Sequence, residues 1–140
     1  MTKDQINLVE KSWDFVVLNT NEAGMIFYGK LFELDPSLRH LFKGDLTQQS
    51  RKLVSMITFI VHKLNNLSEV TADIVALGKR HAKYNVEVKH FDTVALALLQ
   101  TLELALQEQW DEKMKDAWTT VYKILSGAMI DAMKEVDTVA

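Results

Sequence analysis

Apolar residues recur every three or four positions along nearly the whole chain, the spacing that gathers them on one face of an α-helix. The first such run opens at Thr2 and Gln5, which can form a capping box, and extends to Val17. No run alternates cleanly with the period of two that a half-buried strand requires. The pattern therefore predicts an all-α protein.

Few residues interrupt these helical patterns, and they divide the chain into distinct segments. The sequence has 5 glycines and 1 proline. Asp35-Pro36 forces a turn, because the residue before a proline avoids helical geometry. Polar clusters at 19–21, 43–45 and 65–68 and a corner at 84–87 separate the remaining runs. The predicted helices cover about 2–17, 21–34, 36–41, 47–66, 70–83, 90–109 and 112–134.

The length and composition fit a single domain over residues 1–140. Apolar residues make up 48% of the chain, enough to build a core. No apolar run approaches the roughly 18 residues that a membrane span needs. The first five residues hold no apolar targeting segment, so we expect a cytoplasmic protein without a membrane partner.

The charge balance and the cysteine count exclude several classes of function. A net charge of −3 gives no overall basic footprint for nucleic acid. With no cysteine, the chain cannot form disulfides, zinc–thiolate sites, iron–sulfur clusters or covalent thioether bonds to haem.

Helical spacing places several distinctive side chains on shared faces. These sets are Tyr28 with Phe32, Gln49 with Lys52 and Leu53, and Leu77 with His81. Each residue alone has a common structural explanation: a histidine near a helix C-terminus faces solvent, a tyrosine is half-buried and a glutamine is exposed. Taken together, the order of these residues along the chain indicates a pocket with a tyrosine, a glutamine, an imidazole and apolar walls.

That order resembles the globin family over nearly the whole chain. The stretch from Phe27 to Pro36 resembles the second globin helix and the start of the third, and Phe42 follows where globins place a phenylalanine against haem. Residues 78–81, Gly-Lys-Arg-His, resemble the proximal helix. Residues 12–13 and 77–81 are also similar to neuroglobin-like chains, whereas Tyr28 with Gln49 resembles bacterial single-domain globins and flavohaemoglobins. Trp13, Trp118 and Tyr122 match positions in the first and last helices.

The resemblance implies a globin fold of about seven helices packed around non-covalent haem b. It also implies no well-formed D helix, since the link from Phe42 to Gln49 is short. His81 would be the proximal iron ligand, with its other ring nitrogen donating to a backbone carbonyl one turn earlier. Tyr28 and Gln49 would be the distal donors, with Gln48 as the alternative to Gln49.

The remaining expected cofactor contacts follow from the same resemblance. Lys52 and Arg80 would reach the haem propionates, and Phe42 would stack on the porphyrin. The other expected pocket residues are Phe32, Leu53, Ile57, Leu77, Val86, Phe91 and Val94.

Two departures from the flavohaemoglobin pattern restrict the expected chemistry. Phe91 and Met133 stand where those proteins have the tyrosine and glutamate that make the proximal imidazole more anionic, so the push toward O–O cleavage should be weak. The sequence also ends at Ala140 without a flavin or nicotinamide domain. Both points lower the expectation of peroxidase activity and imply a separate reductase.

The resemblance implies reversible, high-affinity O2 binding, with NO or CO as further ligands and a use in oxygen transport or nitric oxide dioxygenation. Hydrogen bonds to a charged acceptor contribute about 1.5–3 kcal/mol each, which favours slow O2 release. A second hypothesis is a six-coordinate redox or gas sensor, with Tyr28 or Lys52 coordinating ferric iron. A third is a haem-free interaction module with a globin fold.

Overall fold

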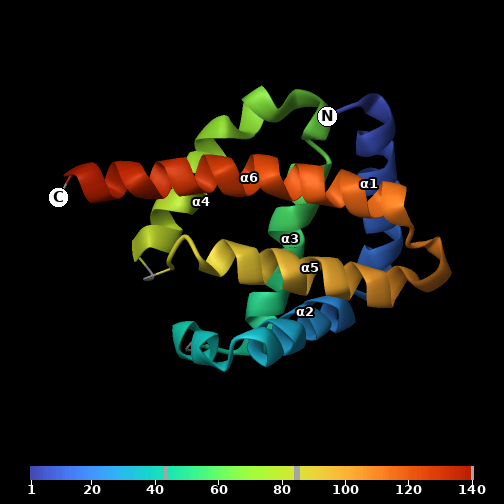
Figure 1. Ribbon diagram of the computed structural model, residues 1–140, viewed down its shortest axis with the longest axis horizontal. Coiled ribbons are helices and arrows are strands. Elements are labelled where there is room, and N and C mark those ends of the chain that lie inside the picture. Colours follow the sequence, from blue (N-terminus) through green and yellow to red (C-terminus); the bar gives the residue numbers. More distant parts are fainter. Residues whose placement is uncertain (43, 84–85, 140) are drawn as a thin grey trace.

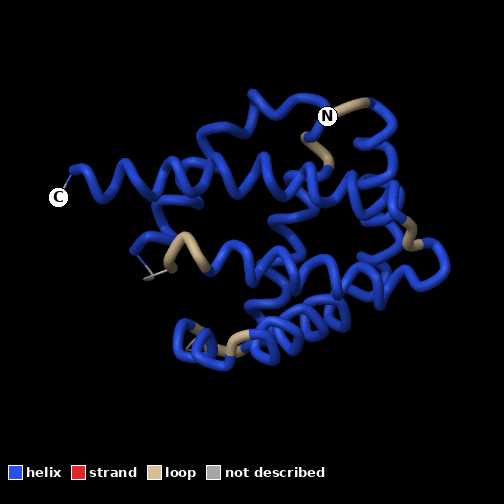
Figure 2. The backbone as a smooth tube through the Cα atoms, in the orientation of Figure 1, coloured by secondary structure: helices blue, strands red, loops and turns tan. Residues whose placement is uncertain are grey.

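Helices form nearly all of the computed structural model, which describes residues 1–42, 44–83 and 86–139, with the side chains of 19–21 and 135–139 left undescribed. The α-helices are α1 (Lys3–Val16), α2 (Thr20–Leu34), α3 (Leu46–Val61), α4 (Thr71–Lys83), α5 (His90–Leu106) and α6 (Glu112–Val139). Short 3-10 segments connect them: η1 (Val17–Asn19), η2 (Pro36–Leu41), η3 (Leu64–Val70) and η4 (Gln107–Gln109). Figure 2 shows no strand in the described chain, which confirms the predicted all-α fold.

Local capping explains where the first helices begin. The Gln5 backbone N–H donates to the Thr2 hydroxyl, and the Thr2 N–H donates back to the Gln5 side chain, both at 3.1 Å. This is the predicted capping box. Asp35 caps η2 ahead of Pro36, and Asp45 accepts a 2.9 Å hydrogen bond from the Thr47 N–H at the start of α3. Positions 42–45 separate η2 from α3, and no D helix lies there in the described residues.

The predicted middle helix, 47–66, is too long. α3 ends at Val61, and the backbone of Asn66 has non-helical angles of φ −141° and ψ 52° inside η3. The chain tightens here because the Lys63 N–H donates to the Ile60 carbonyl, a three-residue spacing in place of four. Polar residues at 65–68 therefore lie in a 3-10 segment between α3 and α4.

The ends of the last two helices also differ from the prediction. α5 ends at Leu106 because Gln107 adopts a positive φ of 50°, which breaks the helical hydrogen-bond pattern. α6 continues past the predicted end near 134 to Val139. The predicted corner at 84–87 lies partly outside the described residues, since 84 and 85 are not described.

Packing between helices rests on two indoles at the centre of the molecule. Trp13 and Trp118 lie with ring centroids 5.7 Å apart and join α1 to α6. The Trp118 indole N–H donates to the Ser12 hydroxyl at 2.8 Å, and the Trp13 N–H donates to Thr58 on α3 at 2.8 Å. Both indole donors are thus satisfied in the core, as buried polar groups must be.

The helices are arranged so that different connecting segments lie at the two ends of the molecule. Figure 1 shows α5 between α6 and α2, with α3 crossing behind them. α4 packs on α6, and α2 packs on α3 and α5. In the same view, η2, the end of α4 and the start of α5 lie at one end, and the turn from α5 to α6 lies at the other. Of the expected site residues, Phe42 follows η2, His81 lies in the last turn of α4 and Phe91 lies in the first turn of α5.

Candidate functional site

His81 lies in the last turn of α4 with its ring half-buried. Its Nδ1 atom is 2.7 Å from the backbone carbonyl oxygen of Leu77, one turn earlier. A carbonyl only accepts hydrogen bonds, so Nδ1 carries the proton and Nε2 keeps a free electron pair. This is the backbone contact expected for a proximal ligand, and it fixes both the tautomer and the orientation of the ring.

The surroundings of His81 keep its imidazole neutral. Burial lowers the pKa of His81 below its usual 6.5, while the hydrogen bond with Leu77 acts in the opposite direction. The charge of the neighbouring Arg80 lowers this pKa further. A neutral imidazole is the form that can bind a metal.

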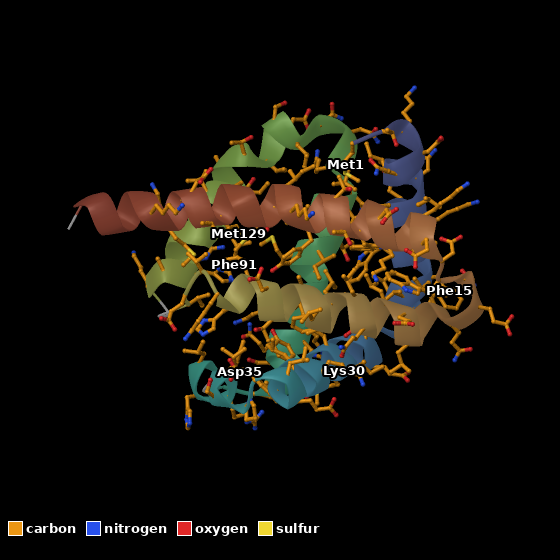
Figure 3. All side chains as sticks on the ribbon, viewed as in Figure 1. Met1, Phe15, Lys30, Asp35, Phe91 and Met129 are labelled. Atoms are coloured by element: carbon orange, nitrogen blue, oxygen red, sulfur yellow. The ribbon has the colours of Figure 1, made fainter. Side chains whose placement is uncertain are left out.

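Phe91 forms one wall beside His81. The two rings lie 6.4 Å apart at 36°. Figure 3 labels Phe91 at the start of α5, beneath Met129 of α6. The Tyr122 hydroxyl of α6 donates a 2.6 Å hydrogen bond to the Phe91 carbonyl. Burial, and the nearby Asp92, raise the pKa of Tyr122 strongly, so this hydroxyl remains a donor. No pattern in the sequence indicates this contact, because its partners are 31 positions apart.

Tyr28 belongs to a cluster of four aromatic rings from α2 and η2. Phe27 and Phe42 each meet it edge-on with centroids 5.1 Å away, and Phe32 stacks at 6.0 Å. Phe32 and Phe42 also meet edge-on, at 5.6 Å. Tyr28 is only 3% exposed. The sequence interpretation identified three of these rings and missed Phe27, which precedes Tyr28 and therefore lies outside the helical spacing that marked the others.

The Tyr28 hydroxyl interacts with Gln49 at the start of α3. Burial raises the pKa of Tyr28, and a hydrogen bond with the Gln49 side chain partly offsets that shift. Gln49 is half-buried, whereas its neighbour Gln48 is exposed. The geometry therefore selects Gln49 as the partner of Tyr28, and the hydroxyl stays protonated at neutral pH.

The expected apolar pocket residues are half-buried, apart from Phe91, which is buried. Leu53 and Ile57 of α3 border a small apolar cavity of about 10 Å³ together with Trp13 and Phe27. The half-buried members are Phe32, Phe42, Leu53, Ile57, Leu77, Val86 and Val94. Large apolar side chains that face the core without being covered are typical of the walls of a ligand site.

Three cations lie on the rim of this region. Lys52 and Arg80, expected near the propionates, are exposed. Arg39 was not expected, yet its guanidinium carbon lies 5.1 Å from the centre of the Phe32 ring. Its position, three residues after Pro36 in a short helix, carries no sequence signal for this contact.

The donor set suits haem better than a protein-bound metal ion. Within the described residues, no three His, Cys, Asp or Glu side chains come close enough to bind a metal together. A single neutral imidazole beside flat aromatic walls is what a porphyrin needs, since the porphyrin supplies four of the iron ligands itself.

The fold and the site thus define an all-helical protein with one free imidazole nitrogen on α4 and a tyrosine–glutamine pair between α2 and α3. The family model described as Globin matches residues 26–129. This chain belongs to the globin family, which binds haem.

Two relatives and one solved structure extend this result. The chain is 33% identical over 148 residues to an anaerobic nitrite reductase of Gossypium hirsutum, covering 95% of this chain and 91% of the relative. It is also 33% identical over 148 residues to one of Casuarina glauca, covering 95% and 92%. The solved structure is an engineered carbene transferase, a variant of a putative nitric oxide dioxygenase from Rhodothermus marinus. Its TM-score is 0.89 at 23% identity, covering 99% of this chain and 97% of that chain, which shows the shared fold.

No helix among the described residues is long and apolar enough to cross a membrane.

Proposed function

We propose that this globin holds haem b non-covalently through His81 and binds O2 reversibly and with high affinity. Bound ferrous haem supplies the ability to take up a diatomic gas. The observation that carries the affinity is the buried Tyr28 hydroxyl, kept protonated and within reach of Gln49. Two donors in one water-poor pocket are suited to a small ligand that carries partial negative charge.

In this proposal, His81 binds the haem iron through its Nε2 atom. Because Nδ1 is already engaged with the Leu77 carbonyl, the ring does not reorient to bind the cofactor. The partner is a neutral carbonyl, and Met133 and Phe91 offer no carboxylate. The imidazole therefore gains little anionic character, which favours ligand retention over O–O cleavage.

The other expected residues have simpler roles in this proposal. Phe42 and the apolar walls would hold the porphyrin and exclude water from Tyr28. Lys52 and Arg80, which are both exposed, would pair with the two porphyrin carboxylates. CO and NO would occupy the same position as O2.

Five-coordinate iron is supported by the positions of the other histidines. His40 and His62 are exposed, and the Nε2 atom of His62, the C-cap residue of α3, lies 4.0 Å from the carboxylate of Asp14 on α1. His90 accepts a 2.9 Å hydrogen bond from the Glu87 N–H. None of these contacts involves the Tyr28–Gln49 pair, which argues against a histidine on both sides of the iron.

Nitric oxide dioxygenation is a use that suits tight O2 retention. That reaction turns O2 and NO into nitrate and leaves the iron oxidised by one electron, which a separate reductase must return. The plant relatives' names favour nitrite reduction as a second candidate, because it needs the same ferrous haem. O2 and nitrite would compete for one position, so nitrite consumption is expected only without oxygen.

A direct test measures O2 dissociation from the ferrous, haem-loaded protein by stopped flow. Gln49→Leu should speed release about tenfold, the effect of losing one hydrogen bond to a charged acceptor. Gln48→Leu is the matched control, because that neighbouring side chain is exposed. Equal off-rates in all three proteins would remove Gln49 from the mechanism.

A further inference from the structure

Charge is distributed unevenly over this acidic chain. Its net charge is −3, yet the segments around the candidate site carry mainly exposed cations. We call this set the basic collar: Arg39, Lys52, Lys79, Arg80, Lys83 and Lys89. The acidic residues within 39–52 and 79–89 are Asp45 and Glu87 only. Glu87 pairs with Lys89 at 3.4 Å, and no other described collar cation lies within ion-pair distance of Asp45 or Glu87.

The collar residues come from η2, α3, α4 and the segment before α5, and several of them lie next to candidate site residues. Arg39 of η2 covers the Phe32 ring, and Arg80 adjoins His81 on α4. Lys52 follows Gln49 by one turn of α3. Lys89, before α5, lies near Asp35, whose pKa is lowered chiefly by its hydrogen bonds with Ser37 and also by the charges of His90 and Lys89. Figure 3 labels Asp35 and Phe91, and both lie at the end of the molecule where η2, α4 and α5 converge.

The collar charges are available to a partner. Among the described residues, Lys52, Lys79 and Lys83 have no acidic side chain within ion-pair distance. The negative end of α4 holds Lys79 and Lys83 favourably, since helix C-termini attract cations, but it leaves their ammonium groups in solvent.

The far end of the molecule has the opposite sign. The turn from α5 to α6 lies there in Figure 1. Its exposed acidic residues are Glu103, Glu108, Asp111, Glu112 and Asp116, and its exposed basic residues are Lys113 and Lys115. The surface of this turn is therefore mainly acidic, in contrast to the basic collar.

We propose that the basic collar is the docking surface for an acidic one-electron carrier protein that reduces the haem iron. This rests on the proposed haem-binding function. In the transfer, the carrier loses one electron and ferric haem becomes ferrous. The cations favour a protein over a small anion, because they are spread around a rim and do not converge on one point. A local cluster of exposed cations of this kind steers an oppositely charged protein and raises its association rate.

The test measures the second-order rate of ferric haem reduction by an acidic [2Fe–2S] ferredoxin in anaerobic stopped flow. The collar variant is Lys79→Glu/Lys83→Glu, and the matched control is Lys113→Glu/Lys115→Glu at the far end. Both variants change the net charge equally, and neither alters a residue placed in the haem site. Gly78, next to Lys79, meets α6 at Met129, and the stretch of α6 from Lys115 to Met129 is about 21 Å long at about 1.5 Å per residue, roughly twice a Debye length of about 10 Å. Reduced riboflavin, a small molecule, serves as the reductant that needs no protein docking surface.

We expect the collar variant to react with ferredoxin about tenfold more slowly at low salt and to lose most of the salt dependence. The control variant and every riboflavin reaction should match the wild type. Equal effects of the two double variants, or a ferredoxin rate that salt does not change, would overturn the docking surface. A milder Lys79→Gln/Lys83→Gln variant gives the same test if the charge reversal unfolds the chain. If the wild-type protein supplied with haem showed no Soret band, the proposed haem binding itself would have failed.

Discussion

Tyr122 of α6 and Phe91 of α5 are tied together by a 2.6 Å hydrogen bond from the tyrosine hydroxyl to the phenylalanine carbonyl. Because the Phe91 ring lies beside His81, this bond connects the last helix to the wall of the candidate haem site. Tyr122, which has no expected role in ligand binding, thus positions Phe91, which is expected to contact the haem.

Removing that hydroxyl should weaken both the fold and the site. Tyr122→Phe is expected to lower the free energy of unfolding by about 1–2 kcal/mol, the cost of one lost buried hydrogen bond. It should also shift the iron–histidine stretching band in resonance Raman spectra of the ferrous protein. Thr120→Ala is the control on the same helix, since its hydroxyl bonds only to the Asp116 carbonyl. A stability loss without a shifted band would confine Tyr122 to a structural role.

Tyr28→Phe should speed O2 dissociation by about tenfold to a hundredfold, since a hydrogen bond to a charged acceptor contributes about 1.5–3 kcal/mol. The raised pKa of Tyr28 adds a prediction about pH. A phenol with a pKa above 10 is almost fully protonated a unit or more below that value, so the wild-type off-rate should be constant between about pH 7 and 9. An off-rate that rises through this range would mean that the donor ionises and that the burial argument is incorrect.

Gly78 allows α4 to lie close to α6. A Cβ atom there would be 2.7 Å from the Met129 carbonyl oxygen and 2.9 Å from Ala132 Cβ. Backbone cannot move aside cheaply, so Gly78→Ala should destabilise the protein by about 1–3 kcal/mol. Gly127→Ala is the control, because nothing lies within 4 Å of its added Cβ. That change should stabilise α6 by about 0.5–1 kcal/mol. Urea unfolding of both variants measures the contrast, and a loss of the same size in both would contradict it.

Gln107 ends α5 with φ 50° and ψ −115°, a conformation that glycine adopts without strain. Gln107→Gly should therefore leave stability unchanged or raise it by up to about 1 kcal/mol, even though glycine usually destabilises folded chains. Gln109→Gly nearby is the comparison and should be neutral or destabilising. Thermal melts with a clearly lower midpoint for Gln107→Gly would show that the left-handed backbone is not strained.

The helical pattern predicted the fold class and most helix starts, because caps and apolar spacing are local. Thr2 with Gln5 and Asp35 with Pro36 each act over a few residues, and each lies where expected. The predicted ends of α3 and α5 were wrong. The change to 3-10 hydrogen bonding at Lys63 and the positive φ of Gln107 cannot be recognised from the residue types at these positions.

For the candidate site too, some features could be predicted from the sequence and others could not. The resemblance to globins identified His81, Tyr28 and Gln49 because these residue types occur in the same order along globin sequences. Contacts that depend on how helices cross, such as Arg39 over Phe32, could be seen only in three dimensions. Their roles toward haem remain predictions.

The central claim is the bond from His81 to iron, and haem binding by His81→Gly tests it most directly. Purified chains are titrated with haemin, and the Soret band is recorded with and without added imidazole. We predict weak, altered haem uptake in the variant, and recovery of the wild-type spectrum when imidazole fills the space left by the side chain. Haem uptake and a spectrum identical to the wild type without imidazole would contradict the account.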